Sequence, residues 1–580
     1  MSDELFMVCW RSLPIILCFK AVAIFLMRRH RLVSVLTSLY DIFTVVKINF
    51  FISFIFATFW LILMQKRYHI PYSVFALDFL NSIILISLLK MSARLSYEGI
   101  VKKLGKSGVN KVLIVGAGSL GVFVANSLNS FANSNQRNVA VGFLDDDKRK
   151  WKYHFQGIKV LGTISDIVKV VEQNDVDTVL FAINHVPKKI ISQCVEHCRV
   201  AGLQVKFQKI PDISTVVDAS SLKIIPQEIN IDDLLGRDPV VLDLNNLADF
   251  LHGKIILITG AGGSIGSELA RKVAGFDPKK LLLLDMAESA LFKTNHDVVR
   301  INNSIATEEI ICDIKDKRML ENVFQSHKID IVYHAAAYKH VPLMEKHIDL
   351  AILNNIIGTK KLAMLSANYK VKNFVMISTD KAVRPTNVMG ATKRICELLI
   401  QSMNGKDVTK FSSVRFGNVL GSNGSVIPLF IDQIKAGGPV TITHKDITRY
   451  FMSIPEAAML VLECSASAEA SDIFVLEMGD PVKIMTLAEK LLDLLNVNDD
   501  IEIKIIGLRP GEKMFEELIT YGEEAIESSI PRVQIIKKTA HIIDDRQLDD
   551  YIKRLEEYAL DKKLEKCRDS LNELLEKSYV

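Results

Sequence analysis

The chain has 580 residues, which is too long for a single hydrophobic core, so several domains are expected. Its 71 basic and 67 acidic residues leave a formal charge of +4, and this near balance gives no electrostatic reason to expect a nucleic acid as a partner. The eight cysteines are scattered, which fits a reducing compartment. Cys194 and Cys198 with His197 could suggest a metal site, but no second cysteine or histidine pair stands at zinc-finger spacing, so no metal is expected.

The first 95 residues are the most apolar part of the chain. Residues 48–64 form an uncharged apolar run that, with Val45 and Val46, reaches the ~20 residues needed to cross a bilayer. Residues 5–27 and 71–91 are weaker candidates because each contains charged residues. We therefore expect a transmembrane region of about three helices in residues 1–95, with a buried helical hairpin as the alternative.

Residues 111–121 read KVLIVGAGSLG, an apolar strand followed by Gly116-x-Gly118-x-x-Gly121 and an apolar helix. This order of strand, glycine turn and helix is typical of a dinucleotide-binding fold. Residues 110–210 are therefore expected to form a Rossmann-like domain of uncertain ligand. Cofactor binding and a regulatory or assembly role without a cofactor both stay open. Residues 211–251 are expected to be a linker.

A second and stronger pattern begins with the apolar strand at residues 254–259, which is followed at once by a glycine-rich turn. The next strand ends at Asp285, 19 residues after Gly266, where a carboxylate accepts both ribose hydroxyls and favours NAD over NADP. Continued alternation of strands and helices predicts an α/β fold with a doubly wound parallel sheet. The expected cofactor contacts are Gly260, Gly263, Ser264, Ile265, Gly266, Asp285, Asp313, Ala335 and Ala336.

Eight motifs follow one another through the second half of the chain. They are TGAGGSIGSEL (259–269), LLLLDMAESALF (281–292), HAAAYKHVPLME (334–345), NNIIGT (354–359), ISTDKAVRPTNVMGATKR (377–394), VRFGNVLGSNGSVIP (414–428), RYFM (449–452) and GLRPGEKMFEEL (507–518). Together they resemble the extended short-chain dehydrogenase/reductase superfamily and, within it, the membrane-bound UDP-N-acetylglucosamine 4,6-dehydratases of bacterial polysaccharide and glycan biosynthesis. The resemblance covers nearly the whole chain.

The resemblance implies N-terminal transmembrane helices followed by two Rossmann-like doubly wound parallel-sheet domains. The second, residues 252–540, would be the NAD-dependent catalytic domain with a smaller C-terminal substrate-binding part, and residues 541–580 would form C-terminal helices. The implied partners are a UDP-sugar, a membrane and further copies of the chain, with no nucleic acid. The implied location is the bacterial inner membrane, multi-pass, with the catalytic domains in the cytosol.

The implied reaction oxidises C4 of the sugar, eliminates water across C5 and C6, and returns the hydride to C6. The product is a UDP-4-keto-6-deoxy-N-acetylhexosamine, and the NAD stays tightly bound because it is recycled. Two other reactions stay open, a dehydration that inverts C5 and a 4-epimerisation, as does a non-catalytic NAD-binding scaffold of a membrane glycosylation complex. The downstream glycan is also open.

The superfamily pattern Y-x-x-x-K has Met389 in place of its tyrosine and keeps Lys393. A thioether cannot shuttle a proton. The resemblance implies that Lys393 orients the cofactor and contacts it. Lys381 is expected to take the C5 proton once burial and Lys393 depress its pKa, and Asp380 to protonate the leaving C6 hydroxyl. Thr379, with Asp380 or a bound water, is our hypothesis for the relay that takes the C4 hydroxyl proton.

The substrate contacts are expected near the ends of the later strands and in the LRPGEK motif. Arginine suits a diphosphate because its fork donates two parallel hydrogen bonds. The expected residues are Lys339, His340, Arg415, Asn418, Arg449, Arg509 and Glu512. Epimerases do not need the acid and base of an Asp-Lys pair, so the stretch 380–381 favours dehydration.

Overall fold

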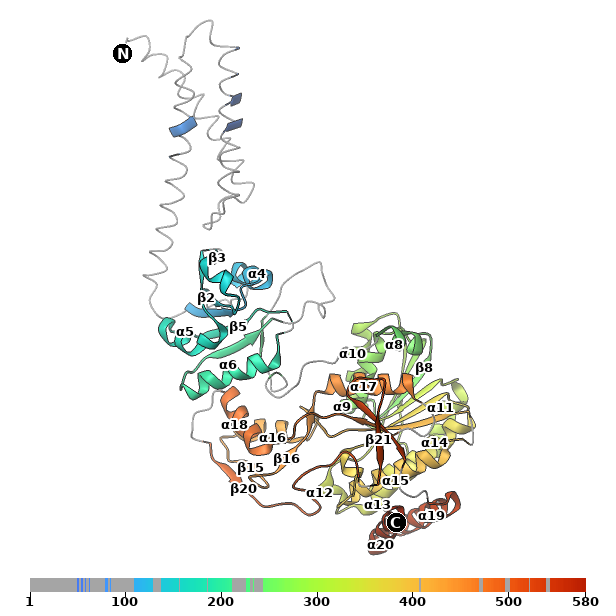
Figure 1. The fold of residues 1–580 in the computed structure, drawn as a ribbon. Coiled ribbons are helices and arrows are strands. Elements are labelled where there is room, and N and C mark those ends of the chain that lie inside the picture. Colours follow the sequence, from blue (N-terminus) through green and yellow to red (C-terminus); the bar gives the residue numbers. More distant parts are fainter. Residues whose placement is uncertain are drawn as a thin grey trace, which may run out of the picture. The chain divides into compact units, whose positions relative to one another are not determined.

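The structure is a computed structural model of the chain. It describes residues 109–128, 137–210, 226–229 and 244–579, apart from gaps at 156, 185, 406–407, 469–472, 496–500, 521 and 539–542, together with isolated positions within 50–84 and residue 233. These residues contain two large, mainly parallel sheets, each with its own helices (Figure 1).

The described residues contain no helix that is long and apolar enough to cross a membrane. Their longest helices, α15 (Val388–Met403), α19 (Asp545–Leu560) and α20 (Leu564–Tyr579), have 16 residues each, whereas a bilayer span needs about 20. The expected segments 5–27, 48–64 and 71–91 lie almost entirely outside the described residues. The expected transmembrane helices are therefore unsupported, and the expected multi-pass location in the bacterial inner membrane is corrected by this finding.

The first sheet has the strand order β3-β4-β2-β1-β5-β6-β7. Its strands are β1 (Val109–Val115), β2 (Arg137–Leu144), β3 (His154–Phe155), β4 (Ile158–Gly162), β5 (Thr178–Phe181), β6 (Lys206–Lys209) and β7 (Gln227–Glu228). Strand β1 pairs in parallel with β2 and β5, and β2 pairs in parallel with β4. The associated helices are α4 (Ser119–Ser127), α5 (Ile167–Asn174) and α6 (Lys188–Val200). The expected Rossmann-like fold is confirmed here.

The second sheet has nine strands in the order β10-β9-β8-β11-β12-β13-β18-β22-β21. They are β8 (Ile255–Thr259), β9 (Lys280–Asp285), β10 (Ala306–Ile311), β11 (Ile331–His334), β12 (Asn373–Ile377), β13 (Lys410–Arg415), β18 (Ile473–Leu476), β21 (Glu524–Glu527) and β22 (Val533–Lys538). The strands from β10 to β18 pair in parallel, and β22 and β21 add to the edge in antiparallel fashion. This order confirms the doubly wound fold expected for the catalytic domain.

Side chains of these strands alternate between two apolar cores, one on each face of the sheet. Leu257 and Leu282 pack with α11 (Lys317–Ser326), α14 (Thr359–Asn368) and α15, whereas Ile256 and Leu281 pack with helices of the other face. Those helices are α8 (Leu244–Leu251), α9 (Ser264–Ala274), α10 (Glu288–Ile301) and α17 (Ile454–Ser467) (Figure 1). Burial on both faces explains why the strands read as unbroken apolar runs.

Short elements complete the part of the chain that contains the second sheet. They are α12 (Val341–Met344), α13 (Ile348–Ala351), the π-helix η5 (Ile352–Gly358), the 3₁₀-helix η6 (Asp380–Ala382), α16 (Val426–Lys435), α18 (Ile484–Leu494), β14 (Asn418–Val419), β15 (Val440–Ile442), β16 (Thr448–Arg449), β17 (Phe451–Met452), β19 (Val482–Lys483) and β20 (Ile503–Ile505). The short strands pair as β14–β17, β15–β20 and β16–β19. The amide of Thr448 donates to the Met514 carbonyl at 3.2 Å, which ties the segment 507–518 to β16.

The helices α19 and α20 pack into the same apolar core as α15. A polar chain adds to this packing, because Arg568 on α20 binds Glu345 at 3.0 Å. The other carboxylate oxygen of Glu345 accepts a hydrogen bond of 2.7 Å from the amide of Val388, the first residue of α15. The C-terminal helices therefore fix the start of the helix that carries Met389 and Lys393.

Replacing Leu555 with alanine should destabilise the protein, because this side chain is fully buried in the core shared by α19 and α15. We expect a loss of about 2–5 kcal/mol, measured by urea denaturation. Leu560→Ala, on the same helix but 65% exposed, is the matched control and should change stability by less than about 0.5 kcal/mol. Equal effects of the two substitutions would contradict the packing of α19.

Candidate functional site

The glycine turn after β8 approaches the loop after β11 closely. Gly260 has a φ of +70°, and a Cβ at this position would lie 2.6 Å from the Ala336 nitrogen. A Cβ at Gly266 would lie 2.1 Å from the Gly260 carbonyl oxygen, so this glycine lets α9 pack against the turn. The strand order reverses between β8 and β11, and doubly wound folds bind their ligands at such a point.

A cavity of about 180 Å³ opens at this point of the sheet. It is lined by Gly260, Gly263, Leu284, Asp285, Met286, Cys312, Asp313, Ile314, Ala335, Ala336, Ala337, Tyr338 and Asn354. Six of the expected cofactor contacts therefore share one cavity. Ser264, Ile265 and Gly266 are not among the lining residues, and they belong to the first turn of α9.

Asp285 is oriented by backbone hydrogen bonds at the end of β9. Its Oδ2 accepts from the amide of Gly262 and its Oδ1 from the amide of Ala287, both at 2.9 Å. Each carboxylate oxygen has a second lone pair, so the group still has acceptor capacity on its cavity side. This arrangement suits a ligand that carries a pair of hydroxyls.

The first sheet has an aspartate at the corresponding strand end, but this carboxylate already binds a cation. Asp145 Oδ2 accepts from the amide of Ala117 at 2.8 Å and from Lys150 Nζ at 2.7 Å. Burial raises the pKa of Asp145, but Lys150 and the backbone amides outweigh burial and hold that pKa below its usual value. Lys150 is thus paired with the carboxylate that would bind a ribose in a dinucleotide site. The ligand of this domain is therefore not assigned.

The structure brings Thr379, Asp380 and Lys381 together at the carboxyl end of β12. The Asp380 side chain is fully buried, and its Oδ1 accepts from the Thr379 hydroxyl at 2.9 Å and from Lys381 Nζ at 3.0 Å. The amide of Asp380 donates to the Phe416 carbonyl at 3.0 Å, which holds the loop against the segment after β13. The three residues form one hydrogen-bonded unit.

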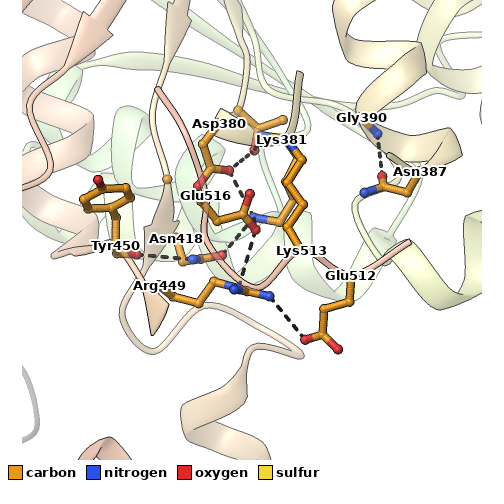
Figure 2. A network of polar contacts seen from close by, with 12 residues as sticks. Asp380, Lys381, Asn387, Gly390, Asn418, Arg449, Tyr450, Glu512, Lys513 and Glu516 are labelled. Atoms are coloured by element: carbon orange, nitrogen blue, oxygen red, sulfur yellow. Dashed lines mark hydrogen bonds and ion pairs between the residues drawn. The ribbon is translucent and has the colours of Figure 1, made fainter. Parts of the chain in front are cut away.

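Lys381 is the centre of a larger polar cluster, which Figure 2 shows from close by. Its Nζ donates to Asn418 Oδ1 at 3.2 Å and pairs with Glu516 Oε1 at 3.4 Å. Burial lowers the pKa of Lys381, but the carboxylates of Asp380 and Glu516 outweigh burial and hold that pKa above its usual value. The expectation of a depressed pKa is therefore wrong, because it did not include a second carboxylate.

Two carboxylate oxygens of this cluster are buried without a hydrogen-bond partner among the described residues. They are Oδ2 of Asp380 and Oε2 of Glu516. A Cβ at Gly417 would lie 3.0 Å from Asp380 Oδ2, so the glycine leaves space beside this buried oxygen. Buried polar atoms are normally partnered. These two oxygens are therefore the atoms best placed to take a proton or a ligand hydroxyl.

Met389 and Lys393 lie one turn apart on α15. Met389 is 4% exposed and belongs to the apolar core rather than to the polar cluster. Lys393 is also buried, and burial lowers its pKa. His334 lies between the hydroxyls of Thr259 and Thr359, each at 2.8 Å. Burial and the charge of Lys393 lower the pKa of His334 to about 3, so it is a neutral structural histidine.

Four of the expected substrate residues join the same cluster. Asn418 binds Lys381 directly, and Arg449 pairs through Nε with Glu516 at 3.4 Å and through Nη2 with Glu512 at 3.3 Å. Glu512 also accepts a hydrogen bond of 3.2 Å from the amide of Arg509, whose side chain is exposed. The cluster thus leads from the Asp380 carboxylate to the backbone of an exposed arginine.

Lys339 and His340 lie five and six residues after the end of β11, and each residue as a whole is exposed. Burial of the amine lowers the pKa of Lys339, and burial followed by the charge of Lys339 lowers that of His340. The imidazole faces Gly424, where a Cβ would lie 2.5 Å from His340 Cε1. The substrate role of both residues stays a prediction.

Arg415 is fully buried, and this corrects its expected contact with a diphosphate. Its five N–H groups donate to Glu397, Glu523 and the Leu518 carbonyl, at distances between 2.8 and 3.1 Å. Burial raises the pKa of Glu397, but Arg415 and Arg394 outweigh burial and lower it to about 2. With every donor engaged by the protein, Arg415 has none left for a ligand.

This buried ion network is joined to the catalytic loop. The hydroxyl of Ser378, directly before Thr379, donates to Glu397 Oε1 at 2.7 Å. Glu397 lies on α15, Arg415 ends β13, and Glu523 directly precedes β21. The network therefore sets the position of the loop relative to strand and helix.

Sequence analysis missed two residues of this site. Glu516 lies in the quoted motif 507–518, but nothing in that motif indicates that its side chain is buried beside Lys381. Asn355 on η5 accepts from the Tyr338 amide at 2.9 Å and donates to the Tyr338 carbonyl and the Thr392 hydroxyl. The sequence signal that could have identified Asn355 is the pair of asparagines at 354–355 between apolar residues. Buried amides at such positions need hydrogen-bond partners.

The chain matches two protein-family models. Residues 256–538 match the model of the family described as polysaccharide biosynthesis protein, and residues 30–208 match the one described as CoA-binding domain. The capsular polysaccharide biosynthesis protein CapD of Staphylococcus aureus is 45% identical over 416 residues, which cover 71% of this chain and 69% of that protein. The probable polysaccharide biosynthesis protein EpsC of Bacillus subtilis is 39% identical over 450 residues, which cover 77% and 74%.

Two further similarities each cover about half of the chain. A UDP-glucose 4-epimerase of Rickettsia rickettsii is 35% identical over 279 residues, which cover 47% of this chain and 79% of that protein. Among solved structures, Pen from Bacillus thuringiensis is 34% identical with a TM-score of 0.47, and the match covers 53% of this chain and 98% of that chain.

Arg415→Met should destabilise the protein rather than weaken ligand binding selectively. The change leaves Glu397 and Glu523 buried without their main cation, and we expect a loss of about 3–5 kcal/mol in urea denaturation. The control is Arg509→Ala, an exposed arginine in the same cluster of motifs, which should leave stability within about 0.5 kcal/mol. A diphosphate contact at Arg415 would give the opposite result, with normal stability and a raised KM.

Proposed function

Because the chain belongs to the polysaccharide biosynthesis protein family, we propose that it catalyses the NAD-dependent 4,6-dehydration of UDP-N-acetylglucosamine to a UDP-4-keto-6-deoxy-N-acetylhexosamine. The observation that carries the proposal is the 3.0 Å contact between the buried Asp380 carboxylate and the Lys381 amine. Elimination of water needs an acid for the leaving hydroxyl and a base for the C5 proton, and this pair supplies both.

The cavity after β8 fits NAD. Gly260 carries no side chain where the turn passes close to the backbone of Ala335 and Ala336, and Asp285 presents a carboxylate suited to a ribose. A 2′-phosphate would be repelled by that carboxylate, so we propose NAD rather than NADP. Bound there, NAD would supply the acceptor for the C4 hydrogen, which is later given to C6. Lys393 is proposed to hold the nicotinamide ribose.

Thr379 is the proposed entry point for the proton of the C4 hydroxyl. Its hydroxyl already donates to Asp380 Oδ1 at 2.9 Å, so a proton accepted by Thr379 can pass to the carboxylate in one step. Asp380 thereby becomes the acid that protonates the departing C6 hydroxyl. The proton released by oxidation of the sugar is then the proton that leaves in the water.

The UDP part of the substrate is proposed to bind through the arm of the cluster that ends at the surface. Arg449 and the exposed Arg509 provide guanidinium groups for the diphosphate, and Lys339 adds a cation after the end of β11. Asn418, which accepts from Lys381, is proposed to orient the sugar next to the acid and base.

A second candidate is 4-epimerisation of a UDP-sugar, which the similarity to the UDP-glucose 4-epimerase of Rickettsia rickettsii favours. Epimerisation keeps the C6 hydroxyl and has no use for a C5 base. A C5-inverting dehydration differs from the main proposal only in the face from which C5 is reprotonated. The mass and proton NMR spectrum of the product distinguish all three.

The full chain, incubated with UDP-N-acetylglucosamine and no added NAD, should form a product lighter by one water, followed by mass spectrometry and proton NMR. Asp380→Asn and Lys381→Ala should each reduce water loss by about 100-fold or more, because each removes one of the two groups that exchange protons with the sugar. Unchanged mass with a new C4 configuration would identify an epimerase. Unchanged substrate would favour a non-catalytic scaffold.

Met389→Tyr should not raise kcat more than about twofold. Met389 lies in the apolar core, and the relay of Thr379 and Asp380 already serves the C4 hydroxyl, so a phenol at position 389 has no vacant proton-transfer role. Thr379→Val is the companion variant and should slow C4 oxidation by about 100-fold. A large gain in Met389→Tyr would mean that the native site lacks an effective base.

A further inference from the structure

We propose that Glu516 is a positioning residue of the dehydratase site, which takes the proton of Lys381 and so allows that lysine to act as the base while Asp380 is already protonated. The inference rests on the proposed function. It assigns an acceptor to the proton that Lys381 must lose before it can act as the base. Glu516 acts through Lys381 rather than on the sugar.

The geometry that supports this role is the position of Lys381 between two buried carboxylates. Its Nζ lies 3.0 Å from Asp380 Oδ1 and 3.4 Å from Glu516 Oε1. The side chain of Glu516 is 3% exposed, and its Oε2 has no partner among the described residues. A buried carboxylate with one oxygen against a lysine and the other unpaired has room for a proton.

The count of protons shows why a second carboxylate is needed. The proposed cycle starts with one ionisable proton in the cluster of Asp380, Glu516 and Lys381. This proton is on the lysine, whose pKa the two carboxylates raise. Oxidation at C4 adds a second proton, which reaches Asp380 through Thr379. Asp380 then has no capacity for the proton of Lys381, and Glu516 is the other carboxylate in contact with that amine.

The cycle then balances. With Asp380 and Glu516 protonated, neutral Lys381 removes the C5 proton while Asp380 protonates the C6 hydroxyl, which leaves as water. Lys381 next returns its proton to C5 as C6 receives the hydrogen taken from C4. Transfer of the Glu516 proton back to Lys381 restores the starting state, and no proton is left over.

Two other charged groups near Lys381 affect how readily its amine loses a proton. Arg449 pairs with Glu516 at 3.4 Å, and its charge opposes that of the lysine. Lys513 donates to the Val383 carbonyl at 2.8 Å, and its amine is influenced by both carboxylates and by Lys381. Both cations disfavour an additional positive charge, which helps Lys381 to give up its proton once Asp380 is neutral.

Glu516→Gln in the full chain tests the proposal, because glutamine keeps the shape but cannot take a proton. We expect water loss at pH 7 to fall by about 100-fold or more. Because solvent must then remove the lysine proton, the remaining rate should rise by about tenfold per pH unit above pH 7, whereas the rate of the unmodified protein stays nearly level. Glu516→Asp should restore the level profile. A loss that is equal at every pH, or activity within twofold of the unmodified protein, would overturn the proposal.

Glu517→Gln is the matched control, with the same chemical change at the neighbouring residue. Glu517 is 36% exposed and binds Arg384 and Lys513 rather than Lys381. It should leave both the rate and the pH profile within twofold of the unmodified protein. If the rate of this control also rose with pH, the pH dependence would result from the loss of any nearby negative charge. That result would overturn the role assigned to Glu516.

A second measurement separates this inference from the proposed function. Competitive labelling of amines with acetic anhydride at a series of pH values, read by mass spectrometry, reports the pKa of Lys381 without any turnover. Removal of an anion lowers the pKa of a neighbouring amine, so the labelling midpoint should fall by at least about one pH unit in Glu516→Gln. An unmoved midpoint refutes the coupling, whereas a shifted midpoint in a protein that does not dehydrate the sugar refutes only the proposed function.

Discussion

The buried ion network of Arg415, Glu397 and Glu523 is the constraint on which the carboxyl end of the second sheet depends. Moving such charges out of water costs several kcal/mol per ion, so the network is stable only while every donor and acceptor has a partner. Its members come from β13, α15 and the chain before β21, and partnering them fixes these elements relative to one another. Through the Ser378 hydroxyl, the same network positions the loop that carries Asp380.

The position of that loop decides the electrostatics of the site. Once Asp380 is fixed, Lys381 lies between its carboxylate and that of Glu516, and the two anions outweigh the effect of burial on the lysine. The amine is therefore charged at rest, and its use as a base requires that a carboxylate accept its proton. In our proposal, acid and base are thus not two residues with independent pKa values but members of one cluster whose protons are redistributed as the sugar changes.

Local patterns predicted the frame of the molecule but not its buried polar groups. The apolar runs, the glycine turn from Gly260 and the aspartate that ends β9 follow from chain order, and the structure places Asp285 in a cavity with five other expected contacts. Arg415 was misassigned because a motif gives the type of a residue and not its burial. Glu516 was missed, and the pKa of Lys381 predicted in the wrong direction, because their contact joins segments far apart in the sequence.

The location of the proton-transferring groups explains why residue 389 can be a methionine instead of a tyrosine. Met389 points into the apolar core of α15, α19 and α20, where a phenol would bring a hydroxyl that needs a partner. The groups proposed to exchange protons with the sugar lie instead on the loop after β12 and on the segment that faces it. They are Thr379, Asp380, Lys381 and Glu516. In our proposal the C4 proton enters through Thr379 and leaves as water through Asp380, so a base on the helix has no proton to accept. The helix then contributes Lys393 and rigid packing, and its first turn is free to be apolar.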